Sequence, residues 1–142
     1  QWQQALLVLE KLRANHGERS DIKANVASYN MAAMACAKGG QWEHVLSLFH
    51  EMPYGIVRPN LISYSTAISA CKMGAQWQTA LSLLERMRSA DVMPVMTNFV
   101  DAISACRKGE QWQEALSLLR LMQTTGIMQH MDAIPVVTMA EE

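Results

Sequence analysis

Apolar side chains recur along the chain with the spacing of amphipathic helices. Between Ser63 and Met73 every third or fourth residue is apolar, as expected for a helix that buries one face. The residues on that face are Tyr64, Ala67, Ile68 and Cys71. A second helical pattern runs from Gln76 to Ser89 and carries Ala80, Leu81, Leu84 and Met87 on one face. Gly74 lies between the two patterns and Pro94 follows them, so the sequence predicts a pair of helices with a tight turn between them.

This pair of helices repeats with a period of 35 residues. The string AISAC at 67–71 recurs at 102–106, and QWQTALSLL at 76–84 recurs as QWQEALSLL at 111–119. A looser copy precedes them, with its aromatic residue, cysteine and tryptophan at Tyr29, Cys36 and Trp42. Since one pair of helices cannot bury its apolar stripe alone, neighbouring units must stack. The predicted fold is all-α, a right-handed superhelical α-solenoid of helix-turn-helix repeats.

Three complete units are predicted, at residues 26–60, 61–95 and 96–130. Residues 1–25 match the second helix of a further unit, followed by an inserted loop at the polar stretch 16–21. Residues 131–142 lack the aromatic residue and the AISAC core, and Pro135 interrupts any helix there. We interpret them as a degenerate cap or a partial repeat. No targeting peptide is visible in the sequence, which begins inside an amphipathic pattern.

The charge argues against strong RNA binding by this chain alone, and the cysteine spacing argues against a disulfide framework or a zinc site. The formal net charge is −1, and no basic stripe of the kind that holds nucleic-acid phosphates stands out. Cys36, Cys71 and Cys106 fall at equal positions of successive units, which is typical of buried thiols and not of a disulfide framework or a zinc site. The pattern is consistent with a reducing compartment.

No catalytic or metal site can be assembled from the sequence. We find no Ser-His-Asp arrangement, paired carboxylates or glycine-rich phosphate loop, and predict no enzymatic activity and no cofactor. His44 and His50 are six residues apart and do not share a helix face, so a shared metal is not expected. Tryptophans at the start of each second helix (Trp2, Trp42, Trp77 and Trp112) are predicted to pack between helices, and Met52, Met87 and Met122 to lie in the core.

The repeat resembles the pentatricopeptide repeat over nearly all of the chain. The resemblance is carried by the 35-residue period, Tyr29-Asn30, Tyr64-Ser65, the small residues leading to Cys-x-Lys, and the linker that ends in Pro59-Asn60. Tetratricopeptide repeats have a 34-residue period and a different first helix. The resemblance implies single-stranded RNA as the partner, bound at about one base per repeat.

By resemblance, two side chains per unit face a base. One directly follows the aromatic residue of the first helix, and the other directly follows the linker proline or its equivalent. The pairs are Asn30 with Asn60, Ser65 with Val95, and Val100 with His130. The first pair resembles a pyrimidine reader that leans to cytosine, Ser65 suggests a purine, and the third pair gives no assignment. The alternative for the two asparagines is that they only cap their helices.

Two further sets of residues follow from the same resemblance. Ala27, Ile62 and Thr97 occupy the position that sandwiches neighbouring bases. Lys38 and Lys108 fall where a lysine often meets phosphate, and Lys72 lies beside Met73, which replaces that lysine in the middle unit.

Two functions therefore stay open. The first is an RNA-binding adaptor of a chloroplast or mitochondrion, acting in RNA processing, stability or translation. The second is a non-catalytic protein-interaction scaffold or structural subunit of a large organellar assembly, such as a ribosome or a membrane-protein complex. Near-neutral charge and the apolar Val95 and Val100 favour the second function.

Overall fold

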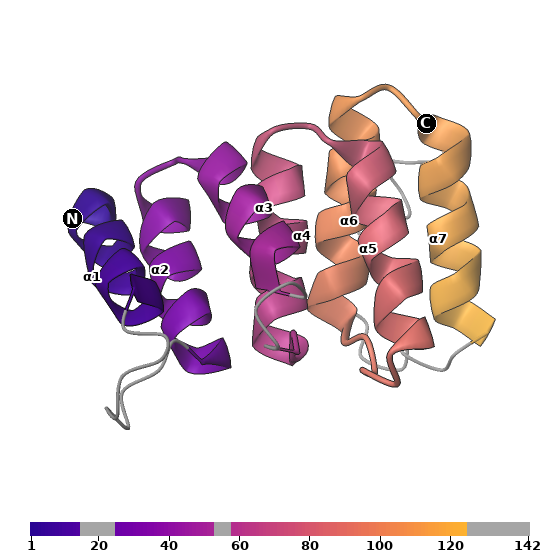
Figure 1. Ribbon diagram of the computed structural model, residues 1–142. Helices are drawn as coiled ribbons and strands as arrows, with labels where there is room; N and C mark the ends of the chain where they lie inside the picture. The colour runs from indigo at the N-terminus through magenta and orange to yellow at the C-terminus, as the bar shows by residue number, and fades with distance from the viewer. Residues whose placement is uncertain (15–24, 53–57, 125–142) are drawn as a thin grey trace.

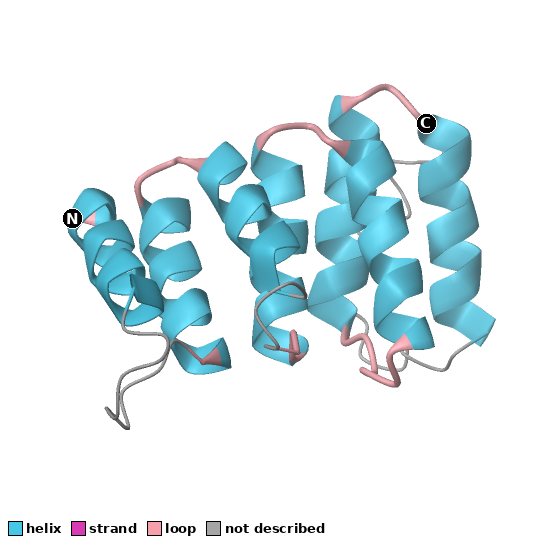
Figure 2. Ribbon diagram, in the orientation of Figure 1, coloured by secondary structure: helices cyan, strands magenta, loops and turns pink. Residues whose placement is uncertain are grey.

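The computed structural model describes residues 1–14, 25–52 and 58–124, which form seven helices and no strand (Figures 1 and 2). The helices are α1 (Trp2–Ala14), α2 (Val26–Lys38), α3 (Trp42–Glu51), α4 (Leu61–Met73), α5 (Trp77–Ser89), α6 (Met96–Lys108) and α7 (Trp112–Thr124). Stretches 16–21 and 131–142, predicted as a loop and a cap or partial repeat, lie outside the described residues. None of these seven helices is long and apolar enough to cross a membrane.

Successive helices stack along the chain from the N-terminal end to the C-terminal end (Figure 1). Within each unit the two helices pack on each other, as α2 with α3 and α4 with α5. Between units, α2 packs on α4 and α4 on α6, while the second helix of each unit packs on the first helix of the next. We call α2, α4 and α6 the first-helix row. The predicted all-α solenoid is confirmed.

Each unit contributes the same set of side chains to a continuous core. Aromatic residues of the first helices, alanines one turn later and cysteines near the helix end are all buried. The second helices add leucines and a terminal methionine, and Met52, Met87 and Met122 are at most 1% exposed, as predicted. The three cysteines are free and fully buried, and burial raises the pKa of Cys71 to about 12. These thiols are therefore structural and unreactive at neutral pH.

An asparagine sets the start of α4 two residues before the predicted Ser63. Asn60 Oδ1 accepts a hydrogen bond from the Ser63 amide at 3.1 Å, and Ser63 Oγ accepts one from the Asn60 amide at 3.1 Å. Asn25 and Ser28 form the same capping box at α2. Each box satisfies two amides that would otherwise lack a partner at the helix end.

Gly74 ends α4 as predicted, and the left-handed residue of the turn is the one that follows it. Gly74 ends α4 with an ordinary φ of −94°, and the left-handed residue is the following Ala75, with φ of 54°. Gly40 and Glu110 hold the same place in the neighbouring units. Here the Gln76 amide donates to the Cys71 carbonyl at 2.9 Å, which closes a Schellman motif.

Gly74 is needed for space, because a tryptophan of the preceding unit lies against it. A Cβ atom on Gly74 would come within 2.5 Å of Trp42 Cδ2. Gly39 faces Trp2 and Gly109 faces Trp77 in the same way. The tryptophans therefore pack between successive units, as predicted for inter-helix contacts, whereas Trp112 is 44% exposed.

Two neighbouring substitutions test these separate roles. We expect Gly74→Ala to lower the free energy of unfolding by about 1–3 kcal/mol, because the new methyl group overlaps the Trp42 ring. Ala75→Gly is expected to raise it by up to about 1 kcal/mol, because glycine adopts positive φ without strain. Urea titrations of the two variants and the parent measure both changes. A stability loss in Ala75→Gly would contradict the assignment of the left-handed position.

Candidate nucleic-acid interface

Five of the six predicted base-reading residues lie along the N-terminal halves of the first-helix row. Asn60 and Val95 immediately precede α4 and α6 and are exposed, whereas Ser65 and Val100 lie half-buried in the second turns of those helices. Asn30 lies inside α2 and is only 5% exposed. The sixth residue, His130, lies outside the described residues.

Asn30 and Asn60 meet, although they are 30 residues apart. Asn30 Nδ2 donates a hydrogen bond to Asn60 Oδ1 at 3.0 Å. Ser63 Oγ is 2.7 Å from Asn30 Oδ1 and 3.0 Å from Asn60 Oδ1, and since a hydroxyl has one proton, the shorter contact takes it. Ser63 is 3% exposed, so this bond is shielded from water. Asn60 caps α4 and also bonds Asn30, whereas Asn30 is not a cap.

A second polar contact joins the next two units. Asn98 of α6 donates from Nδ2 to Ser65 Oγ of α4 at 2.9 Å. The Oδ1 atom of Asn98 accepts from the Val95 amide at 2.9 Å. Asn98 is 1% exposed. Thus Ser65 is held by a side chain of the following unit, as Asn30 is held by Ser63, but Ser65 and Val95 are not brought together by any hydrogen bond.

The predicted base-sandwiching residues share one position. Ala27, Ile62 and Thr97 are the second residues of α2, α4 and α6, and all three are exposed. Ile62 has 52% of its surface exposed. They line the same end of the first-helix row as Asn60 and Val95.

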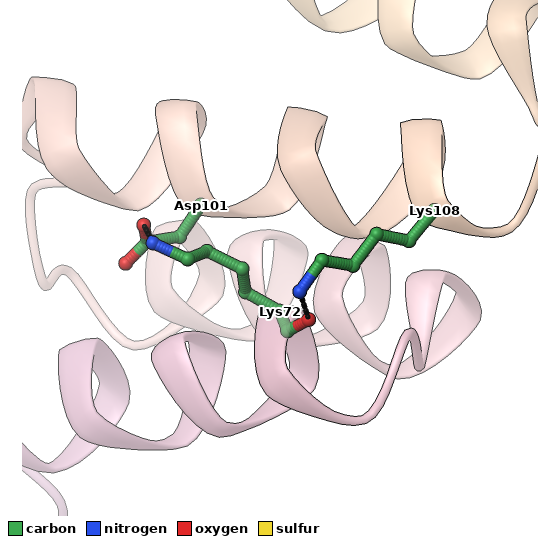
Figure 3. Close-up of polar contacts among 3 residues, drawn as sticks. All are labelled: Lys72, Asp101 and Lys108. Carbon is green, nitrogen blue, oxygen red and sulfur yellow. Dashed lines mark hydrogen bonds and ion pairs between the residues drawn. The ribbon is translucent and has the colours of Figure 1, made fainter.

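Two of the three predicted phosphate lysines are engaged by the protein itself. Lys72 Nζ lies 3.5 Å from Asp101 Oδ1, and Lys108 Nζ donates to the Lys72 carbonyl oxygen at 2.9 Å. Figure 3 shows the two contacts as dashed lines. Both contacts run from one first helix to the next. Lys38 is exposed and makes no ion pair within the part of the chain that the structure describes.

Asp101 is the one acidic side chain of α6 and lies almost buried in the first-helix row. Burial raises the pKa of its carboxyl above the ordinary value of 3.8, while the nearby Lys72 ammonium acts in the opposite direction. A carboxylate here also repels phosphate. Its ion pair with Lys72 therefore weakens the attraction of Lys72 for a phosphate.

Each of the two described histidines lies against an aromatic ring. His44 lies against Trp2 with ring centroids 5.0 Å apart, and His50 lies edge-on to Phe49. Within residues 1–14, 25–52 and 58–124, no group of three or more His, Cys, Asp or Glu side chains is placed to hold a metal ion.

Comparison with known proteins gives the repeat its family. A family profile described as a pentatricopeptide repeat domain matches residues 11–73 and 47–109, and one described as a PPR repeat matches 102–127. The chain belongs to the pentatricopeptide-repeat family. Among curated proteins no sequence matches it.

Solved pentatricopeptide-repeat structures share the fold. The crystal structure of PPR10 from maize matches with a TM-score of 0.69 at 16% identity, over 89% of this chain and 18% of that one. PPR10 in complex with an 18-nt psaJ RNA element, solved also as a cysteine-to-serine variant, matches with a TM-score of 0.68 at 24% identity, over 82% of this chain and 18% of that one. The present chain thus spans less than a fifth of the length of these structures.

Sequence reasoning missed the residues that connect one pentatricopeptide repeat to the next. Ser63, Asn98 and Asp101 were assigned no role, although each contacts a predicted site residue of the preceding unit. One signal was available for the first two: Asn25-x-x-Ser28 and Asn60-x-x-Ser63 have capping-box spacing, and Asn98 stands 35 residues after Ser63. Nothing in the sequence marked Asp101.

The buried bond between Ser63 and Asn30 is expected to stabilise the stack. Ser63→Ala removes the partner of a nearly buried amide oxygen, so we expect a loss of about 1–3 kcal/mol in the free energy of unfolding. Ser28→Ala is the matched control, since among the described residues the Ser28 hydroxyl bonds only to Asn25 of its own helix cap. Chemical denaturation of both variants gives the difference. Equal losses would show that only the capping box matters.

Lys72 is expected to hold down the pKa of Asp101. In Lys72→Met the carboxyl keeps its burial but loses the nearby positive charge, so its pKa rises further, as a carbon NMR titration of Asp101 would report. Because the folded pKa is raised, the contribution of Asp101 to stability is present below its ordinary pKa and is lost as pH rises through the folded value. Lys72→Met shifts the upper end of that window to higher pH. Lys108→Met, which removes a bond to a carbonyl and not to the carboxyl, should move the pKa less.

Proposed function

We propose that the N-terminal halves of the first-helix row bind single-stranded RNA, at about one base for each of the units 26–60, 61–95 and 96–130. The observation that carries this proposal is the pairing of Asn30 with Asn60. Asn60 Oδ1 is occupied by Ser63 and Asn30, whereas Asn60 Nδ2 has no partner among the described residues and the side chain is exposed. An amide held in one orientation with free N–H donors suits the edge of an unpaired base.

Family membership supports the same function. The solved relatives include PPR10 bound to RNA, and the present chain shares their fold. We extend the proposal to an adaptor without chemistry of its own that acts on RNA processing, stability or translation in a chloroplast or mitochondrion. This part of the proposal rests on the resemblance alone.

Charge and reading residues set the expected strength. The chain has a net charge of −1, and Lys72 and Lys108 already have protein partners. If each unit recognised its base with about 1–3 kcal/mol, three units would give roughly micromolar affinity at best after the cost of ordering the strand. Binding by this chain is therefore expected to be weak.

A protein-binding scaffold is the second candidate, favoured by apolar side chains on the first-helix row. Met31 is 72% exposed and Met34 46% exposed on α2, and Ile62 and Val95 are also exposed. Such side chains are typical of surfaces that bind another polypeptide. Under this reading the row holds a protein subunit of a larger assembly instead of RNA.

Asn60→Ser tests the RNA proposal. Serine still caps α4, so folding should be kept, but the amide donors are lost and affinity for single-stranded RNA should fall several-fold. Asn25→Ser makes the same exchange at the N-cap of α2. No predicted base-reading residue pairs with Asn25 among the described residues, so this variant should leave the affinity for RNA unchanged. Fluorescence anisotropy with short single-stranded RNA at micromolar protein measures both.

The outcomes separate the two candidates. An equal effect of the two variants would remove Asn60 from the reading pair. Absence of RNA binding in the parent at tens of micromolar, together with crosslinking of a defined protein to Met31 or Met34, would support the scaffold.

A further inference from the structure

The contact between Ser65 and Asn98 has only one possible polarity. A backbone N–H can only donate, so the atom of Asn98 that faces the Val95 amide at 2.9 Å must be the carbonyl oxygen Oδ1. The other end of the amide, Nδ2, therefore faces Ser65 at 2.9 Å. Since Nδ2 can only donate, Ser65 Oγ must accept.

This polarity decides what Ser65 offers to a ligand. With one lone pair used by Asn98, the Ser65 hydroxyl proton has no partner among the described residues. The side chain is half-buried in the second turn of α4, beside the exposed end of the first-helix row. Its proton is therefore free to be donated outward.

We infer that Asn98 is a specificity-determining residue of the second unit, which fixes Ser65 as a hydrogen-bond donor and so selects a base with an unprotonated ring nitrogen. This inference rests on the proposed RNA function. On their Watson–Crick edges, adenine and cytosine present such a nitrogen, whereas guanine and uracil present a ring N–H at the corresponding place. Asn98 itself is 1% exposed and does not touch the base, so it acts through Ser65.

The neighbouring junction shows that the arrangement is not an accident of one side chain. At the position of Asn98 the preceding unit has Ser63, which donates to Asn30 Oδ1 at 2.7 Å. There a short side chain supports a long one, and at the second junction a long side chain supports a short one. In both cases a buried residue of one unit fixes the orientation of the reading residue before it.

Asn98→Asp reverses the polarity with almost no change of shape. One carboxylate oxygen still accepts from the Val95 amide, but the other can only accept, so Ser65 turns its proton inward and presents a lone pair outward. The carboxylate lies at the third residue of α6, where the helix N-terminus favours negative charge, so folding is expected to persist.

The test compares the parent and Asn98→Asp on short homopolymers of adenosine, cytidine and uridine by fluorescence anisotropy. Homopolymers remove any need to know the register, because the other units are the same in both proteins. We expect the ratio of adenosine to uridine affinity to fall at least about fivefold in Asn98→Asp. In the Ser65→Ala background the same substitution should leave the ratio unchanged. An unchanged ratio in the Ser65-containing protein would overturn the inference while leaving RNA binding intact.

If Asn98→Asp does not fold, two measurements on proteins that retain Asn98 still test the inference. Replacing adenosine by 1-deazaadenosine removes the acceptor nitrogen, and should weaken binding to the parent but not to Ser65→Ala. In a nitrogen–proton correlation spectrum without RNA, the Asn98 side-chain amide signal should shift in Ser65→Ala, because its acceptor is lost. No shift would overturn the inference without any reference to RNA, whereas a shift with no RNA binding in the parent would reject the proposed function and, with it, the selection of a base.

Discussion

The spacing of the stack depends on a tryptophan ring that packs against a residue with no side chain. A Cβ on Gly74 would come within 2.5 Å of Trp42, and the same contact is made by Trp2 on Gly39 and by Trp77 on Gly109. Each contact joins the second helix of one unit to the end of the first helix in the next. The separation of the packed first helices is short enough for polar side chains to reach from one to the next at hydrogen-bond distance.

That separation also determines the electrostatics of the first-helix row. Lys72 of α4 reaches Asp101 of α6, and Lys108 reaches back to the α4 carbonyl of Lys72. Positive charges that the family resemblance assigns to phosphate are thus partly committed to holding neighbouring units together. Their availability to a ligand is lower than a count of basic residues suggests.

The sequence predicted the parts of the structure that are periodic. Amphipathic spacing located the helices, and the 35-residue offset placed the buried aromatic, cysteine and methionine residues. Gly74 ends its helix as predicted, but the reason for a glycine there could not be predicted, because it is a ring from another unit that leaves no room for a side chain. The period places Asn98 at the position of Ser63, but its contact with Ser65 could not be predicted, since it depends on a distance between two helices that no local pattern encodes.

The pairing of a proposed reading residue with a supporting residue across a repeat boundary has a consequence for the evolution and engineering of such arrays. Asn30 is matched to Ser63, and Ser65 to Asn98, with side-chain lengths that compensate each other. A single repeat cut at residue 60 or 95 therefore loses the side chain of the next repeat that is hydrogen-bonded to its proposed reading residue. The unit to transfer between arrays is therefore the junction of two adjacent repeats. The two residues that meet at a junction should change together, in evolution or in design.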